Sequence, residues 1–260
     1  MKKQLTGLIL IFLLAVFLPH ANAGGMFGPP QTLSDTAGGL NTAIGYRYHT
    51  DTYKNHLHYK MRQNVIYSHA AWGKAGIWEI YARLNAADIK IQDRFRFGVT
   101  SFGNGENDFR DHWKFFGTTG AKVFYPVNSL FGVSAFVQGN FNPGKYKDNT
   151  ILYDNGSSSA ANLNIKNLWD VNLGAGLQFT LPYDIRTYAG PFVYFARADA
   201  QFSLDIPGLP FVTGKTVLKN SSPVGGYFGA DIPLIKGFRL NIEGQYTSRF
   251  SAGAAISYVY

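Results

Sequence analysis

The sequence predicts an all-β protein, a transmembrane antiparallel up-and-down β-barrel of about ten strands. Three observations carry this prediction: segments in which apolar and polar residues alternate, an amino-terminal export signal, and an aromatic-rich composition with no second long apolar run. The alternation is clearest in residues 238–247, where Leu240 and Ile242 alternate with Arg239 and Asn241. In an extended chain these two sets face opposite sides, so that one face meets hydrocarbon and the other meets water.

Residues 1–23 have the features of a cleaved secretory signal peptide. Two lysines precede an apolar run that is too short to span a bilayer, and an A-x-A cleavage site ends at Ala23. We expect residues 24–38 to form a flexible periplasmic segment or a lumen plug, and residues 39–260 to form one barrel domain. The chain has no cysteine, which excludes disulfides, thiol chemistry and cysteine-bound metal.

The composition favours the same class of protein. Tyr and Phe number 16 and 21, which suits the aromatic girdles that flank the lipid-facing band of a barrel. The formal charge of +8 becomes +6 when the two lysines of the signal peptide are removed. Because no basic run with interleaved aromatic residues is present, this charge favours contact with outer-membrane lipid and lipopolysaccharide over nucleic acid.

From residue 39 onward the chain divides into ten segments of alternating or nearly alternating polarity. Each is close to the length of a tilted membrane strand. The expected strands are 39–50, 57–70, 76–88, 112–125, 130–142, 167–181, 185–202, 221–232, 237–247 and 250–260. Eight or twelve strands are the alternatives, because 89–111 could hold another hairpin and 185–202 could be divided differently.

The connections between these segments alternate in length. Short turns are expected at 71–75, 126–129, 182–184 and 233–236; on the other side, long loops are expected at 89–111, 143–166 and 203–220 and short ones at 51–56 and 248–249. Bacterial barrels have short periplasmic turns and longer extracellular loops. We therefore expect the long loops outside the cell and both termini in the periplasm.

The export signal, the Gly-rich alternating strands and the terminal Ser257-Tyr258-Val259-Tyr260 resemble the outer-membrane β-barrel superfamily of Gram-negative bacteria. The resemblance covers the whole mature chain. It implies a location in the outer membrane and delivery to the barrel-assembly machinery, with Tyr258 and Tyr260 in the assembly signal. It selects no function, because the superfamily holds structural proteins, adhesins, narrow pores, lipid-modifying enzymes and proteases.

Charged residues on the polar faces of the expected strands should point into the lumen. They are Arg47, His49, Lys60, Arg62, Glu79, Arg83, Lys114, Lys122, Asp170, Arg197, Asp199, Asp231, Arg239 and Glu243. One interpretation is a structural network of ion pairs and hydrogen bonds, in which Glu243 balances nearby guanidinium groups. The other is a narrow water-filled path with mild anion preference, because cations outnumber acids.

Histidines gather in the first hairpin and raise the question of a metal site. A hairpin folded about residues 53–54 would set His49 opposite His58, with Asp51 and His56 nearby. This spacing is loose and more typical of polar rim residues. The sequence therefore predicts no metal and no cofactor, with these four residues as weak metal candidates.

No enzymatic activity is predicted. Asp108, Asp111 and His112 do not match the paired Asp-Asp and Asp-His motifs of omptin-type surface proteases. Ser68 and His69 are adjacent, so a regular strand sends them to opposite faces. We expect a non-enzymatic outer-membrane protein, structural or weakly pore-forming. The alternatives are a narrow anion-preferring porin and a surface-binding or adhesion barrel that acts through its extracellular loops.

Overall fold

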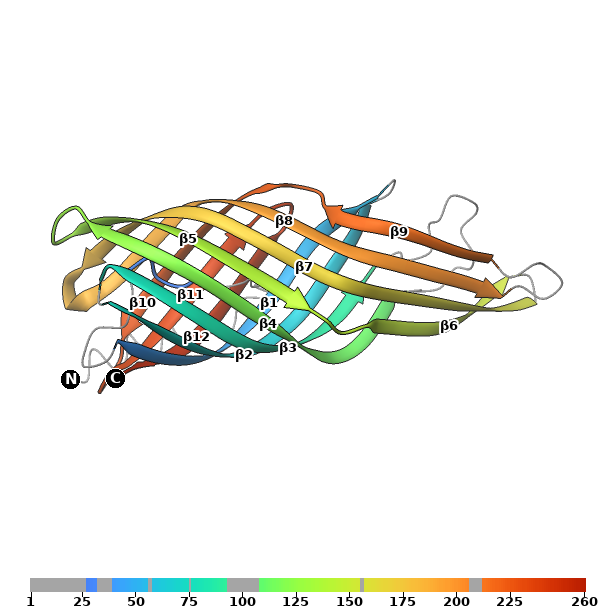
Figure 1. Ribbon diagram of the computed structural model, residues 1–260, viewed down its shortest axis with the longest axis horizontal. Helices are drawn as coiled ribbons and strands as arrows, with labels where there is room; N and C mark the ends of the chain where they lie inside the picture. Colours follow the sequence, from blue (N-terminus) through green and yellow to red (C-terminus); the bar gives the residue numbers. More distant parts are fainter. Residues whose placement is uncertain are drawn as a thin grey trace, which may run out of the picture.

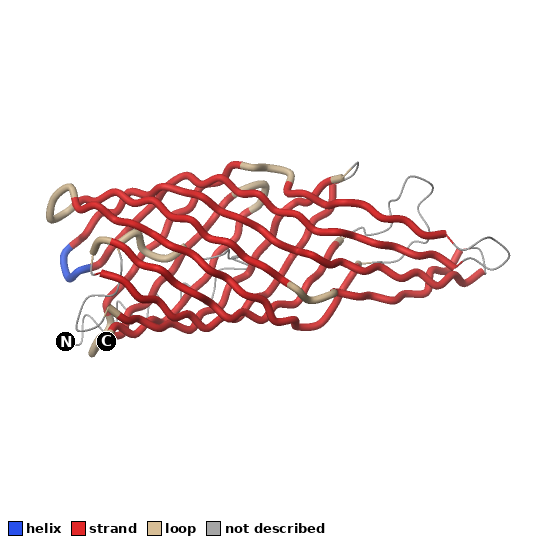
Figure 2. The backbone as a smooth tube through the Cα atoms, viewed as in Figure 1, coloured by secondary structure: helices blue, strands red, loops and turns tan. Residues whose placement is uncertain are grey.

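The computed structural model describes residues 27–31, 39–55, 58–74, 76–92, 108–154, 157–205 and 212–260. The predicted signal peptide and parts of the predicted loops lie outside these ranges. Nearly all of the described chain is β-strand joined by short turns, and the one helical element among the described residues is a 3₁₀ turn, η1 (Pro182–Asp184) (Figure 2). No helix among the described residues is long and apolar enough to cross a membrane.

Twelve strands lie in the described ranges. They are β1 (Leu40–Lys54), β2 (His58–Lys74), β3 (Trp78–Ile91), β4 (Phe109–Pro126), β5 (Phe131–Asn142), β6 (Tyr146–Asp154), β7 (Ser157–Leu181), β8 (Ile185–Asp205), β9 (Val212–Asn220), β10 (Val224–Pro233), β11 (Phe238–Tyr246) and β12 (Phe250–Val259). Ten of them form a ring in the order β1-β2-β3-β4-β5-β7-β8-β10-β11-β12, which closes where β12 pairs with β1 (Figure 1). The predicted ten-stranded antiparallel barrel is confirmed.

The strands β6 and β9 extend the wall at the end away from the carboxyl terminus (Figure 1). β6 follows β5 along the first part of β7, and β9 precedes β10 along the last part of β8. Each break contains a proline, Pro143 or Pro223, which has no N–H for the ladder. The prediction of long loops at 143–166 and 203–220 is wrong for most of these residues, because pairing along β7 and β8 continues past both prolines.

An apolar band covers the outer face of the half of the barrel that contains the carboxyl terminus. Its exposed side chains include Leu40, Ile44, Tyr46, Ile66, Trp72, Ile80, Leu84, Phe115, Val123, Val137, Leu173, Leu177, Phe195, Phe228, Phe238, Ile242 and Ile256. Soluble proteins rarely expose continuous apolar surface of this extent. A closed ring also leaves no unpaired backbone edge to face hydrocarbon. The band is therefore the membrane-spanning zone.

Aromatic rings on the inner wall lie across glycines of neighbouring strands. Tyr67 is paired with Gly45 across β1 and β2, and Tyr188 is paired with Gly229 across β8 and β10. A Cβ atom at either glycine would collide with the ring. These glycines allow bulky rings to lie against the wall and narrow the lumen.

Beyond the membrane-spanning zone the arrangement of apolar and polar faces is reversed. Ile89, Ile91, Phe109, Tyr146 and Ile165 are buried inside the extended end and belong to one hydrophobic cluster. The residues that alternate with them carry charges and face outward. This end of the molecule is therefore packed like a soluble domain.

Candidate functional site

Residues 27–31 lie inside the barrel. Phe27 is only 4% exposed, and the segment contacts side chains of β4, β7 and β11. The described part of the predicted 24–38 segment is therefore a lumen plug, not a free periplasmic segment; its other residues lie outside the described ranges. We call residues 27–31 the plug.

Glu243 on β11 holds the start of the plug. Its Oε1 accepts hydrogen bonds from the backbone N–H of Phe27 (2.8 Å) and from Gln245 Nε2 (2.8 Å). Its Oε2 accepts from the N–H of Gly28 (2.9 Å) and from the hydroxyl of Tyr188 (3.0 Å). Four donors thus satisfy a carboxylate that is 1% exposed. No described guanidinium contacts it, so the prediction that Glu243 balances arginine side chains is wrong.

The ring of Phe27 is enclosed by three aromatic side chains of the wall. Its centroid lies 4.2 Å from Phe136, 5.0 Å from Phe192 and 5.2 Å from Tyr227, the last two edge-on. Such edge-to-face contacts are favourable beyond the apolar area that they bury. Gly174 leaves the space for two of these rings, since a Cβ there would meet Phe136 and Phe192.

Two further contacts secure the rest of the plug. The ammonium group of Lys122 donates to the carbonyl of Pro29 at 3.0 Å. Gln31 and Gln178 form a reciprocal pair, in which the N–H of Gln31 donates to Gln178 Oε1 (3.0 Å) and Gln178 Nε2 donates to Gln31 Oε1 (2.9 Å). The plug is therefore anchored on three sides of the lumen.

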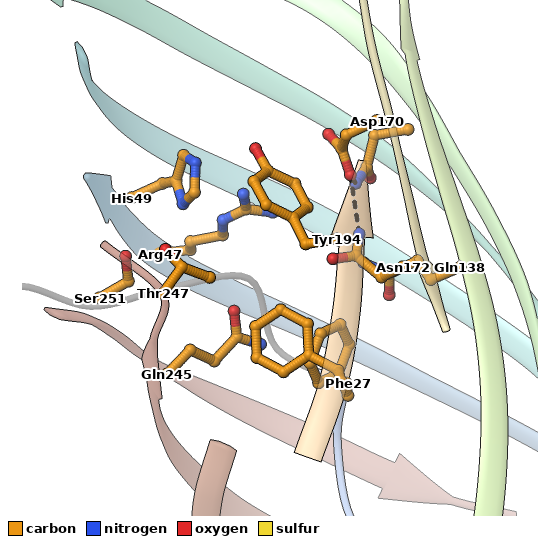
Figure 3. A pocket seen from close by; sticks show the side chains of 12 residues that line it. Phe27, Arg47, His49, Gln138, Asp170, Asn172, Tyr194, Gln245, Thr247 and Ser251 are labelled. Carbon is orange, nitrogen blue, oxygen red and sulfur yellow. Dashed lines mark hydrogen bonds between the residues drawn. The ribbon is translucent and has the colours of Figure 1, made fainter. Parts of the chain in front are cut away.

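The plug separates two small polar cavities, and Phe27 lines both of them. The cavity on the side of the extended end measures about 20 Å³ and is lined by polar side chains that include Arg47, Asp170 and Asn172 (Figure 3). The other measures about 40 Å³ and contains Glu79, Arg83 and Lys122 in its lining. A single water needs about 10–15 Å³, so each of these spaces holds at most a few waters.

Ion pairs and hydrogen bonds connect the charges around the plug. Lys122 Nζ lies 3.1 Å from Glu79, and Arg239 Nε lies 2.5 Å from the fully buried Asp231. Arg83 lies over the rings of Tyr67 and Tyr81 and donates from Nε to Nδ1 of His69. These contacts join neighbouring strands and stiffen the wall.

The predicted lumen charges divide into two groups. Eight of them lie on the inner wall of the membrane-spanning zone: Arg47, Glu79, Arg83, Lys122, Asp170, Asp231, Arg239 and Glu243. The others lie at the extended end. Lys114 pairs there with Asp111 at 3.5 Å.

Four residues predicted to point into the lumen point outward instead. On β2, Tyr59, Met61 and Val65 are buried inside, which turns Lys60 and Arg62 out. On β8, Ala196, Ala198 and Ala200 pack inside, and Arg197 and Asp199 pair with each other on the outer face at 3.8 Å. The prediction for these four fails because water or headgroups, not hydrocarbon, surround this end of the barrel.

The first-hairpin histidines are not brought together. His49 is paired with Gln63 and faces the lumen, whereas His58 is paired with Lys54 and is exposed on the outer face. The expected pairing of the two histidines is wrong, because the hairpin folds beyond Lys54. His56 lies outside the described ranges. Asp51 is buried and accepts from Ser248 Oγ at 2.6 Å, and the described residues contain no cluster of three metal-ligating side chains.

The remaining predicted residues lie apart from the lumen or from one another. Ser68 is exposed on the outer face, whereas His69 faces inward toward Arg83. At the carboxyl end, the ring of Tyr258 lies 4.9 Å from Phe238 and 4.8 Å from Tyr260. These aromatic rings lie at the edge of the apolar band, and their role as an assembly signal stays a prediction.

The anchors of the plug were not found from the sequence. Phe27 and Gln178 belong to segments with no motif that marks them as partners, and the hydrogen bonds that hold the plug join residues 93 to 216 positions apart. The sequence holds one indication of the plug: Phe27 is an isolated aromatic residue in the Gly- and Pro-rich stretch Gly24–Pro30, which is not part of any expected strand. A large ring in such a stretch indicates a docked segment.

No protein-family model and no curated protein match this sequence. Solved structures similar to it include the translocator domain of the autotransporter NalP from Neisseria meningitidis, at 14% identity and a TM-score of 0.48, covering 86% of this chain and 89% of that one. The outer membrane protease OmpT from Escherichia coli has 10% identity and a TM-score of 0.42, with 86% and 94% covered. The toluene transporter TodX from Pseudomonas putida has 9% identity and a TM-score of 0.38, with 92% and 94% covered.

The geometry defines the class of the molecule. A ring of ten antiparallel strands carries an apolar band outside and polar and aromatic side chains inside. Only helices and closed barrels satisfy every backbone hydrogen bond in hydrocarbon. The chain is a transmembrane β-barrel of the outer-membrane type, with part of its own amino-terminal segment bound in the lumen.

Proposed function

We propose that this chain is a non-enzymatic outer-membrane barrel that its own plug holds closed at rest, and that its resting role is structural. The observation that carries the proposal is the capture of the plug by Glu243, whose two oxygens accept the backbone N–H groups of Phe27 and Gly28. Side-chain carboxylates that bind two consecutive amides hold a segment in one position.

The charges of the lumen support closure over anion conduction. Of the predicted lumen charges that face inward beside the plug, four are cations and four are acids: Arg47, Arg83, Lys122 and Arg239, and Glu79, Asp170, Asp231 and Glu243. Several of them are joined in ion pairs. The excess of cations that suggested anion preference disappears beside the plug, because Lys60, Arg62, Arg197 and Asp199 face outward and Lys114 lies at the extended end.

A narrow pore that opens on release of the plug is the second candidate. One observation favours it: polar side chains line the cavities on both sides of Phe27, so removal of the plug would join two hydrated spaces. The plug is held by hydrogen bonds and ring contacts, which are reversible.

Planar-bilayer conductance of the purified mature protein tests both candidates. We compare the unaltered protein with a variant in which residues 27–31 are replaced by a Gly-Ser stretch of equal length. A matched control carries the same kind of replacement at residues 127–130, in the short turn between β4 and β5. The control should behave like the unaltered protein.

The proposal predicts silence from the unaltered protein. Conductance steps in the plug variant alone would establish the plug as a gate and support the second candidate. Silence in both would leave the structural role and eliminate the pore. Steady conductance from the unaltered protein would overturn the proposal, because a closed lumen does not conduct.

A further inference from the structure

Five cations gather on the outer face of the barrel just beyond the apolar band. They are Lys60, Arg62, Lys90, Arg110 and Arg249, from β2, β3, β4 and the turn between β11 and β12. We call them the basic patch. None of them takes part in the plugged lumen, and the function proposed above makes no use of them.

Strand register places these cations side by side. Arg62 is directly opposite Lys90, and Lys90 is directly opposite Arg110. Lys60 and Arg62 lie on the same face of β2, roughly 7 Å apart along the strand. Arg249 reaches over β1, where its Nε donates to Thr52 Oγ1 at 3.1 Å, and Thr52 is the cross-strand partner of Lys60.

Such an arrangement is unfavourable by itself, because like charges directly opposite each other on a sheet destabilise it. The nearby carboxylates are already engaged. Asp108 pairs with Lys90 at 2.6 Å and lies 3.8 Å from Arg110, and both oxygens of Asp88 accept hydrogen bonds from Asn64. Within the described ranges Lys60, Arg62 and Arg249 have no carboxylate within ion-pair distance. The buried Nε of Arg62 has no hydrogen-bond partner there.

The level of the basic patch on the wall matches the surface of the membrane. Tyr246 and Phe250 are exposed on either side of the turn that carries Arg249, so Arg249 lies at the edge of the apolar band. On β1 and β2 the band ends where the hydroxyl of Tyr46 donates to Asn64 at 2.7 Å. Tyrosine is enriched where a membrane protein meets the headgroups.

We propose that the basic patch binds the phosphate groups of an anionic lipid in the outer leaflet, the lipid A part of lipopolysaccharide. Arginine and lysine on adjacent strands supply convergent donors for phosphate oxygens, and arginine does so in a bidentate manner. The acyl chains of that lipid would lie against the apolar band directly below, over Tyr46, Ile66 and Leu84, which are exposed. The phosphates of the headgroup would thus contact the basic patch, and the acyl chains would contact the apolar band.

Native mass spectrometry of the full mature chain in detergent tests this site. The probes are lipid A with two phosphates, lipid A with its phosphates removed, and inorganic phosphate. The test variant combines Arg62→Gln with Arg249→Gln. The matched control combines Lys74→Gln with Lys236→Gln, which removes the same charge at the opposite end of the barrel.

We expect the test variant to bind phosphorylated lipid A about 30-fold more weakly than the unaltered protein, because it lacks two cations that would lie near the anionic headgroup. The control should change less than about twofold. If the double variant loses the β-sheet circular dichroism spectrum, the single variant Lys60→Gln, with an expected loss of about fivefold, replaces it.

Three results would overturn the site. Equal losses in the test and control variants would show a general charge effect. Equal binding of lipid A with and without phosphates would show that the acyl chains alone bind. Inorganic phosphate that binds as tightly as lipid A would identify a site for a free anion and not for a membrane lipid.

Discussion

The same strands follow opposite rules in the two halves of this molecule. In the membrane-spanning zone β3 turns Ile80 and Leu84 outward and Arg83 inward, whereas in the extended end it turns Ile89 inward and Lys90 outward. Nothing in the hydrogen-bond ladder of a strand requires this change. The medium outside the wall requires it, because hydrocarbon surrounds one half and water or headgroups surround the other.

The strands make this change in two ways. On β3 the apolar residues move from even to odd positions while the strand keeps its own alternation of inward and outward side chains, although its pairing with β4 shifts between Ala87 and Ile89. On β7 the apolar residues keep odd positions, and a bulge turns the chain instead. There the pairing with β8 shifts between Lys166 and Trp169, and Asn167 takes a left-handed backbone conformation with φ of 52°. This bulge keeps Ile165 inside and Trp169 outside.

Removing a ring from the core of the extended end should have the largest effect on stability. Phe109 is completely buried, and Phe109→Ala should lower the free energy of unfolding by about 3–5 kcal/mol. Urea unfolding of the refolded protein in detergent measures this. Arg110→Ala, the outward neighbour, should cost less than about 0.5 kcal/mol. Equal effects at the two positions would contradict the soluble-like packing of this end.

A charge placed in the apolar band should have the next largest effect. Leu84→Arg puts a guanidinium group on the same outer face of β3 that carries Lys90 farther along. It should cost about 2–4 kcal/mol, because the outer surface at Leu84 meets hydrocarbon. Folding titrations in lipid vesicles provide the measurement, with Ala86→Ser as a control on the same face. A barrel that tolerates Leu84→Arg would place the edge of the membrane elsewhere.

Neutralising Glu243 should loosen the plug while the wall stays intact. An amide offers one acceptor oxygen where the carboxylate offers two, so donors among Phe27, Gly28, Tyr188 and Gln245 would lose their partner. We expect Glu243→Gln to weaken plug binding by about 1–3 kcal/mol. Faster hydrogen exchange at the amides of residues 27 and 28 would report it. Asp88→Asn, on the outer face, should leave those amides protected.

The smallest effect is expected at the rim near the carboxyl terminus, where Asp184 contacts Arg239 at 2.7 Å and Arg186 at 3.1 Å. Burial raises the pKa of Asp184, but the hydrogen bond from Arg239 and the charge of Arg186 outweigh it and leave the pKa below its usual value. The unfolded chain therefore binds the proton more tightly. This contribution to stability is present above about pH 4 and is lost as the pH falls through the lowered pKa.

Thermal unfolding of the protein and of Asp184→Asn, measured from about pH 3 to pH 6, tests this sign. Acidification should lower the melting temperature of the unaltered protein slightly more than that of the variant. A steeper loss in the variant would mean that Asp184 is protonated more readily in the folded state.

The alternation of Leu240, Ile242 and their polar neighbours sufficed to predict the ring of ten strands, because hydrocarbon imposes one pattern on every segment that it surrounds. The same pattern misplaced Arg62 and Arg197, since it was applied where no hydrocarbon lies. Pro143 and Pro223 explain why β6 and β9 were not predicted. Each proline interrupts the strand that contains it, whereas the long neighbouring strand, β7 or β8, continues and pairs with the next segment. Contacts of the plug with Gln178 and Glu243 depend on distant parts of the chain, and no local pattern encodes them.

The central claim is that the plug occupies the lumen, and a disulfide trap tests it most directly because the natural chain has no cysteine. The pair Gln31→Cys with Gln178→Cys joins positions whose side chains contact each other at 2.9 Å. The control pair combines Gln31→Cys with Gln63→Cys, on the inner wall of the extended end. We predict that mild oxidation of the folded protein cross-links the first pair and not the second, and that unfolding in urea before oxidation abolishes the preference. Free reaction of the Gln31→Cys thiol with maleimide in the folded protein, without a cross-link to position 178, would contradict the claim that the plug closes the barrel.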